Sequence, residues 1–97
     1  PIFVDVRMGA AVMGQETIVR GNPALAIRVI GTAPVEKVEI VRNNEYIHTR
    51  QGTGAAELSF QYVDAAPIRG KKSYYYVRVF QVGEAYAWGS PIWVTVK

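Results

Sequence analysis

The chain has 97 residues, 49% hydrophobic and 20% charged, a length and balance that fit one small globular domain and exclude intrinsic disorder. Eleven Lys and Arg against eight Asp and Glu give a net charge of +3, and their only cluster, Arg69, Lys71 and Lys72, is not the basic stripe of a nucleic-acid binder. The absence of cysteine excludes disulfides and thiolate chemistry, and no apolar run is long enough for a helix to span a membrane.

Apolar residues alternate with polar ones along most of the chain, a period of two that is typical of half-buried β-strands. Turn-forming Gly, Pro and Asn interrupt the alternation at short intervals. The pattern predicts seven strands, at residues 2–8, 24–31, 35–42, 45–50, 56–62, 73–82 and 85–96. A short extra edge strand is expected around Thr17 to Arg20. No helix is required, so we expect an all-β sandwich in one domain, residues 1–97.

The first hairpin is expected to turn at Asn43-Asn44, because Asn tolerates the positive φ angles of a two-residue type I′ turn. This turn places Ile40 opposite Ile47, with both side chains directed into the core. It also places Glu39 opposite His48, on the face that meets solvent.

The second hairpin is expected to turn at Gly83-Glu84, where Gly in first position suits a two-residue type II′ turn. This register places Tyr74 opposite Trp93 and Val79 opposite Trp88. Apolar residues of one parity then form the core. They are Tyr75, Val77, Val79, Trp88, Ile92, Val94 and Val96, with Leu25, Ile27, Val29, Leu58 and Phe60 from other strands.

Candidate catalytic groups are few and isolated. His48 is the single histidine, and the pattern supplies no second metal ligand or base partner for it, so we interpret it as an exposed structural neighbour of Glu39. Asp5 and Asp64 have no acidic companion close in sequence, although a pair formed by distant loops stays open. None of the three serines lies in a nucleophile elbow. An enzymatic or metal-binding role around His48 is the residual alternative.

Two loops could be read as anion sites. Gly52-Thr53-Gly54 lacks the Lys-Ser/Thr pair and the helix of a phosphate loop, which favours a flexible connection between strands. Arg69, Lys71 and Lys72 could bind an anion at one end of the sandwich, but a solvated loop leading into a strand is the preferred interpretation.

The most informative surface is a row of aromatic residues on the outer side of the last hairpin. Exposed apolar patches often mark interfaces, and contact surfaces favour aromatic residues and Arg. We therefore predict an interaction surface, here called the aromatic face. It consists of Tyr74, Tyr76, Arg78, Phe80, Trp93, Val41 and Tyr46. The alternatives are a cross-strand ladder that only stabilises the sheet, and a strip on which sugars stack.

The segment Ser73 to Val79, SYYYVRV, and the segment Ala87 to Val94, AWGSPIWV, resemble the end of a fibronectin-III or immunoglobulin-like domain. There, a Tyr-x-Val-x-Val strand is followed by a last strand that contains Ser-Pro. More narrowly, the chain resembles the C-terminal β-sandwich domain of large bacterial and archaeal proteins. Their preceding region is similar to metal-dependent phosphoesterases of the polymerase-and-histidinol-phosphatase (PHP) type. Further matching segments are MGQE at 13–16, GTAPVEKVEI at 31–40 and VRNNE at 41–45, with Asp64, Pro67 and Gly70. Gly89 departs from that tail, where Ser is expected.

The resemblance implies an immunoglobulin-like (fibronectin-III-like) antiparallel sandwich of about seven strands. It implies a non-catalytic accessory module, without a cofactor or metal, that packs on and stabilises or orients an upstream PHP-type domain of the same polypeptide. The start at Pro1 rather than Met predicts a piece of a longer protein, and the resemblance implies that it is the C-terminal part. Tyr75 is expected to form a tyrosine corner, its hydroxyl bonding to nearby backbone.

The expected partner is thus the upstream domain, with weak self-association in its absence and no nucleic acid or membrane. The alternative function is a carbohydrate-binding module that uses Tyr74, Tyr76 and Trp93 as stacking platforms.

Overall fold

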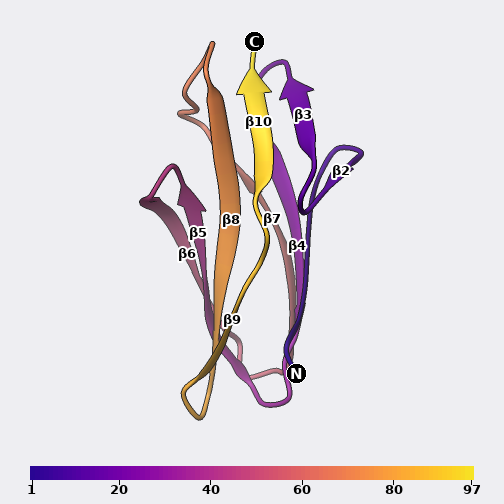
Figure 1. Cartoon of the computed structure of the whole chain (residues 1–97). Coiled ribbons are helices and arrows are strands. Elements are labelled where there is room, and N and C mark those ends of the chain that lie inside the picture. Colours follow the sequence, from indigo (N-terminus) through magenta and orange to yellow (C-terminus); the bar gives the residue numbers. More distant parts are fainter.

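The computed structural model describes residues 1–97 and contains two β-sheets packed face to face, with no helix (Figure 1). The first sheet has the order β2 (Ala11–Val12), β1 (Phe3–Met8), β4 (Ala24–Ile30) and β7 (Glu57–Val63). The second has the order β3 (Glu16–Val19), β10 (Ile92–Val96), β8 (Lys72–Gln81), β5 (Val35–Arg42) and β6 (Glu45–Gln51), and β9 (Ala85–Trp88) pairs with β8. The predicted all-β sandwich is confirmed.

The segment between β1 and β4 carries the chain from one sheet to the other. β2 pairs with β1, and β3 then pairs with β10 in the opposite sheet, so the extra edge strand expected near Thr17 is confirmed. The crossing occurs at Gly14, whose φ of 88° favours glycine and whose N–H donates to the carbonyl of Pro91 at 2.8 Å. Because of this crossing, β3 runs parallel to β10, the one parallel pair in an otherwise antiparallel sandwich.

The core lies between the sheets and follows the predicted parity in most strands. After the exposed Lys72, β8 alternates buried and half-buried residues to its end, because every second side chain points inward. The expected core residues that are buried are Leu25, Ile27, Val29, Leu58, Tyr75, Val77, Val79, Ile92, Val94 and Val96. Phe60 is only half-buried and packs against the margin of this core.

The prediction that Trp88 lies in the core is wrong, because its side chain is 62% exposed. The second hairpin has a three-residue loop at 82–84 rather than two residues at 83–84, with positive φ at both Gly83 and Glu84. One additional loop residue shifts the register of β9 by one and turns its side chains over. Trp88 consequently lies opposite Arg78 on the outer face.

The last strand is also interrupted, although residues 85–96 were expected to be continuous. Residues 89–91 lie outside both β9 and β10, and the expected pairing of Tyr74 with Trp93 is restored only beyond them. Figure 1 shows this irregular segment between β9 and β10.

The first hairpin turns at Asn43-Asn44 as expected, with φ of 50° and 69°. A register shift then leaves Ile47 as an extra residue on β6, so that His48 lies opposite Ile40. The predicted pairing of Glu39 with His48 is therefore wrong. His48 instead stacks on Tyr62 of the other sheet, with 4.4 Å between ring centroids.

Candidate functional site

The aromatic face is built on β8, the strand between β10 and β5. Its outward residues Tyr74, Tyr76, Arg78 and Phe80 alternate with buried ones and are each half-buried themselves. Since β8 is flanked on both sides, these side chains pack against neighbours from several strands. The alternation therefore gives one continuous surface rather than separate exposed rings.

Toward the start of β8, the aromatic face is a stack of rings. Tyr74 and Tyr76 lie with ring centroids 6.2 Å apart and planes at 11°, and Tyr74 meets Trp93 across the strand at 5.4 Å. The Tyr74 hydroxyl donates to Oδ1 of Asn44 at 2.7 Å. The positions of Tyr74, Tyr76 and Trp93 on one outer surface thus agree with the alternation in the sequence.

Toward the end of β8, the aromatic face is organised around the guanidinium of Arg78. The central carbon of this group lies 5.3–5.5 Å from the ring centroids of Phe80, Tyr46 and Trp88. Nη1 of Arg78 also donates a hydrogen bond to the Tyr46 hydroxyl, and its Nε lies 3.9 Å from a carboxylate oxygen of Glu39. Cation–π contacts of this kind contribute about 0.5–1 kcal/mol at exposed sites. Arg78 therefore contacts rings from β6, β8 and β9 at once.

The structure changes the membership of the aromatic face in two places. Val41 is 1% exposed between its cross-strand neighbours Tyr46 and Tyr76, so it supports the surface from beneath and offers no contact area. Trp88 and Tyr86, both 62% exposed on β9, extend the surface instead. Sequence reasoning missed these two residues because their side depends on the length of the loop at 82–84.

A hollow of about 310 Å³, here called the aromatic notch, lies at the interruption of the last strand. It is lined by Tyr74, Tyr76, Trp88, Gly89, Pro91 and Trp93. Gly89 donates its N–H to the Val77 carbonyl at 3.0 Å, and a Cβ there would lie 3.0 Å from the Met13 sulfur. A side chain at Gly89 would therefore point between the sheets, and glycine lets the irregular segment lie close to Met13 and Val77.

Beneath the surface, a polar network surrounds Asp64. One carboxylate oxygen accepts hydrogen bonds from the Tyr75 hydroxyl at 2.6 Å and from Nη1 of Arg42 at 2.8 Å, and the other accepts from the N–H of Ala66 at 3.1 Å. The expected bond from Tyr75 to nearby backbone is therefore wrong, because the acceptor is a side chain. The partners of Asp64 lie 11 and 22 residues away in the sequence, so the alternation pattern did not predict this role.

The electrostatics of the network favour a charged carboxylate. Burial opposes ionisation of Asp64, but the hydrogen bonds from Tyr75 and Arg42 outweigh it, so the pKa of Asp64 lies below its ordinary value. Burial and the adjacent carboxylate raise the pKa of Tyr75. These groups bind one another in the interior, which is the arrangement of a structural clamp between β5, β8 and the chain after β7.

His48 lies at the margin of the core rather than on the solvated face. Burial, assisted by the positive charge of Arg50, lowers the pKa of His48, and its Nε2 atom is buried without a hydrogen-bond partner. The structure contains no group of three His, Asp or Glu side chains placed to hold a metal ion. No helix is long and apolar enough to cross a membrane.

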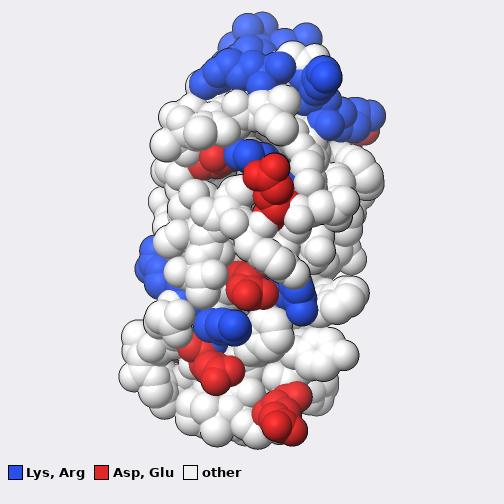
Figure 2. All heavy atoms as spheres, turned by 90° about the vertical axis from the view of Figure 1, so that its left-hand side faces the viewer, with Lys and Arg blue, Asp and Glu red and all other residues white.

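Figure 2 shows Lys and Arg side chains gathered at the end of the sandwich where the C-terminus lies. Arg69 donates to the backbone carbonyls of Gly21 and Lys97 and to Oδ1 of Asn22 at 2.9–3.3 Å, and the bond to Lys97 puts it beside the C-terminus. Lys72 forms an exposed ion pair with Glu16 at 3.2 Å. Arg69 thus joins two chain segments, which supports the loop interpretation over an anion site.

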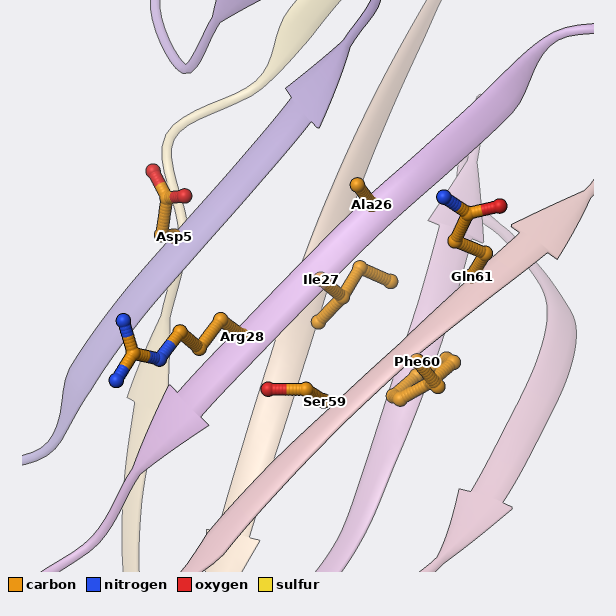
Figure 3. A pocket seen from close by; sticks show the side chains of 7 residues that line it. All are labelled: Asp5, Ala26, Ile27, Arg28, Ser59, Phe60 and Gln61. Atoms are coloured by element: carbon orange, nitrogen blue, oxygen red, sulfur yellow. The ribbon is translucent and has the colours of Figure 1, made fainter.

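A second hollow of about 380 Å³ lies on the outer face of the four-stranded sheet (Figure 3). It is lined by Asp5, Ala26, Ile27, Arg28, Ser59, Phe60 and Gln61. The small side chains of Ala26 and Ser59 leave the hollow open between larger neighbours. Arg28 is paired with Glu57 at 3.0 Å, so this face is polar and differs in character from the aromatic face.

Comparison with known proteins supports the fold and identifies relatives that are much longer than the chain. No family model matches the chain. It is 32% identical to an uncharacterised protein of Chlamydia trachomatis serovar D and 35% identical to one of Chlamydia pneumoniae, over 112 aligned residues and 99% of the chain. The chain spans only 18% of the length of each of these relatives.

Among solved structures, the chain is similar to the fibronectin(III)-like modules of Clostridium thermocellum CbhA. The TM-score is 0.59 at 18% sequence identity, and the match covers 95% of both chains. Together with the two packed sheets and the absence of helices, this likeness defines the fold as a fibronectin-III-like β-sandwich.

Proposed function

We propose that this chain is a non-catalytic accessory module that docks through its aromatic face onto another domain of the same polypeptide. The observation that carries the proposal is the continuous exposed aromatic surface on one sheet. Its most exposed members are Trp88 and Tyr86 at 62%, Tyr46 at 59% and Trp93 at 40%. Large apolar patches of this kind mark interfaces.

The opposite outer face of the same molecule provides an internal comparison. There, β1, β4 and β7 direct outward mainly small or charged residues, such as Asp5, Arg28 and Ser59. The sandwich can therefore present a polar sheet face to water and does so on one side. The concentration of aromatic residues on the other side is in excess of what the fold requires.

The aromatic face is also arranged for binding before a partner arrives. Arg78 lies among three rings, and Tyr74 is fixed by Trp93 and Asn44. Side chains that are already ordered lose less conformational entropy on association. The same surface would therefore bind more tightly than an equal area of mobile side chains.

The partner we infer is an upstream PHP-type metallohydrolase-like domain, which the module stabilises or orients. The resemblance of the sequence to the tail of such proteins supports this partner. The lengths of the relatives support it as well, since about four-fifths of each lies outside the matched region. The catalytic and metal-binding residues would belong to that domain.

The test compares a charge introduced into the aromatic face with the same charge on the opposite face. Tyr76→Glu and the control Phe3→Glu, at a position that is 51% exposed, are each placed in the isolated chain and in the parent polypeptide. We expect Tyr76→Glu to lower the Tm of the parent by more than that of the isolated chain, because it breaks docking in addition to any local cost. Equal shifts in both would contradict docking.

A carbohydrate-binding module is the second candidate, and the aromatic notch is the observation that favours it. Trp88, Trp93 and Tyr74 could stack on sugar rings. However, the notch contains no carboxylate or amide side chain to accept hydrogen bonds from sugar hydroxyls. Saturable binding of a soluble polysaccharide that is lost in Trp93→Ala would favour this candidate over docking.

A further inference from the structure

We propose that the aromatic notch binds a proline-containing extended segment of the polypeptide outside this domain, an inference that rests on the proposed docking function. A polyproline II segment presents apolar pyrrolidine rings and backbone carbonyls that no internal hydrogen bond occupies. Grooves lined by aromatic side chains are the known receptors for such segments. The aromatic notch has the matching shape, chemistry and rigidity.

The shape follows from the interruption of the last strand. Tyr76 forms the floor, Trp88 lies on one side and Trp93 on the other, while Gly89 and Pro91 close the remaining wall. A volume of about 310 Å³ lies at the lower end of the range of about 300–1,000 Å³ for ligand pockets. The notch therefore suits a short stretch of chain inserted between two indole rings.

The lining consists of apolar rings that carry indole N–H donors and tyrosine hydroxyls, which donate or accept. The side chains supply the indole N–H groups of Trp88 and Trp93 and the hydroxyl of Tyr76, whereas the Tyr74 hydroxyl already donates to Asn44. No side chain of the lining is charged. A ligand that offers carbonyl acceptors and apolar rings is complementary to the indole N–H groups and the aromatic rings of this lining. Proline-containing backbone meets that description, because each proline supplies an apolar ring and a backbone carbonyl.

The backbone around the notch argues against the other common mode of peptide binding, addition of a strand to a sheet edge. Pro91 cannot donate a ladder hydrogen bond, and the N–H of Gly89 is already used by the Val77 carbonyl at 3.0 Å. Residues 89 and 91 thus offer no free N–H group for a strand ladder, which favours recognition by side chains. Polyproline recognition relies on side chains in this way, whereas strand addition relies on main-chain bonds.

The source of the segment is the longer polypeptide, because the chain spans only 18% of the length of its relatives. A covalently linked segment is held at high effective concentration, so a weak site is sufficient. The contact would fix the domain against its neighbour at one defined point on the aromatic face.

The two tryptophans of the chain both line the notch, which makes the site directly observable. In an amide correlation NMR spectrum of the ¹⁵N-labelled chain, two indole N–H signals are expected. We expect both to shift saturably with a decaproline peptide and to stay unchanged with a Gly-Ser peptide of equal length. Absence of a saturable shift, or an equal response to both peptides, would overturn the inference.

Variants separate the notch from general surface binding. Tyr76→Ala removes the floor and is expected to weaken decaproline binding by at least about tenfold, or about 1.4 kcal/mol, whereas Phe3→Ala on the opposite sheet leaves it unchanged. Trp88→Ala, at an exposed position, is a second variant that does not rely on a half-buried side chain. Undiminished binding in both notch variants would contradict the assignment.

The outcomes also distinguish this inference from the docking proposal. Indole shifts produced by cellohexaose and not by decaproline would overturn the peptide site in favour of carbohydrate. If decaproline fails while Tyr76→Glu still destabilises the parent selectively, the peptide site is wrong and docking stands. If decaproline binds and the parent shows no selective loss, docking is wrong.

Discussion

Replacing Asp64 by alanine removes the acceptor shared by two buried donors. The Arg42 and Asp64 side chains are only 12% and 4% exposed, and Tyr75 is fully buried. Asp64→Ala leaves the guanidinium and the hydroxyl without their charged partner. Breaking a buried ion pair from one side costs about 3–5 kcal/mol, because the remaining charge stays desolvated. Small domains have a total stability of about 5–15 kcal/mol, so the variant is expected to be marginal.

The contribution of the tyrosine can be separated from that of the ion pair. Tyr75→Phe removes one hydrogen bond to a charged acceptor, which costs about 1.5–3 kcal/mol, and leaves Arg42 paired with Asp64. In the double variant Asp64→Ala/Tyr75→Phe, no buried hydroxyl is left without its partner. The loss of unfolding free energy in this variant should therefore be smaller than the sum of the two single losses by about 0.5–3 kcal/mol.

Urea unfolding followed by far-UV circular dichroism measures these losses, with the slope m expected to stay constant. Glu57→Ala is the matched control, because it breaks an ion pair with Arg28 whose side chains are 53% and 57% exposed. Such pairs contribute about 0–1 kcal/mol. A loss for Asp64→Ala no larger than that for Glu57→Ala would refute the clamp.

The pKa of Asp64 adds a pH dependence of defined sign. Because its pKa in the folded chain is below the ordinary value of 3.8, the unfolded chain takes up the proton first as the pH falls. The stabilisation is thus fully present above about pH 4 and is lost as the pH falls through the lower folded value. Asp64→Asn should flatten this part of the curve of unfolding free energy against pH. If Asp64→Asn loses unfolding free energy below about pH 4 as the unchanged chain does, the lowered pKa of Asp64 is contradicted.

Three further predictions concern single positions. In an NMR titration, the pKa of His48 should lie below its ordinary value of 6.5. Its protonation should lower the free energy of unfolding as the pH falls below 6.5, because the unfolded chain takes up the proton first. A titration midpoint of His48 at or above 6.5 would contradict its burial. Gly52→Ala should lower the free energy of unfolding by at least about 1–3 kcal/mol in thermal unfolding, because a Cβ would lie 1.7 Å from the backbone oxygen of Val35. The loss should exceed that of Gly54→Ala, where no atom lies within 4 Å of the added Cβ and only the φ of 93° opposes the change. In urea unfolding, Trp88→Ala should lower the free energy of unfolding by under about 1 kcal/mol, whereas Ile92→Ala should lower it by about 2–5 kcal/mol. Similar losses for the two variants would favour the register in which Trp88 is buried.

Much of the fold could be predicted because its signals are local. The alternation in β4 and β8 determines which side chains point inward, so Leu25, Ile27 and Tyr75 were placed in the core correctly. The strand ends followed from Gly, Pro and Asn in the turns. The errors arose where one residue is added without a sequence signal. Ile47 is such a residue in the first hairpin, and positive φ at the non-glycine Glu84 accompanies the longer loop of the second.

The candidate site divides in the same way. Tyr74, Tyr76 and Trp93 were predicted on one surface because they follow the parity of β8 and its partner. Trp88 was missed because one additional residue in the loop at 82–84, just before β9, decides on which face its side chain lies. The clamp around Asp64 was missed because it depends on tertiary packing, although a lone Asp just after a strand and ahead of a tyrosine-rich strand is a signal that could have raised the possibility.

The central claim is that the aromatic face is covered by another part of the parent polypeptide, and hydroxyl-radical footprinting with mass spectrometry measures this directly. The oxidation of Trp88 and Trp93 is compared between the isolated chain and the parent, with exposed Phe3 on the opposite sheet as the internal reference. Docking predicts that both tryptophans are protected several-fold in the parent while Phe3 is oxidised equally in both. Equal oxidation of the tryptophans in the two samples would contradict it.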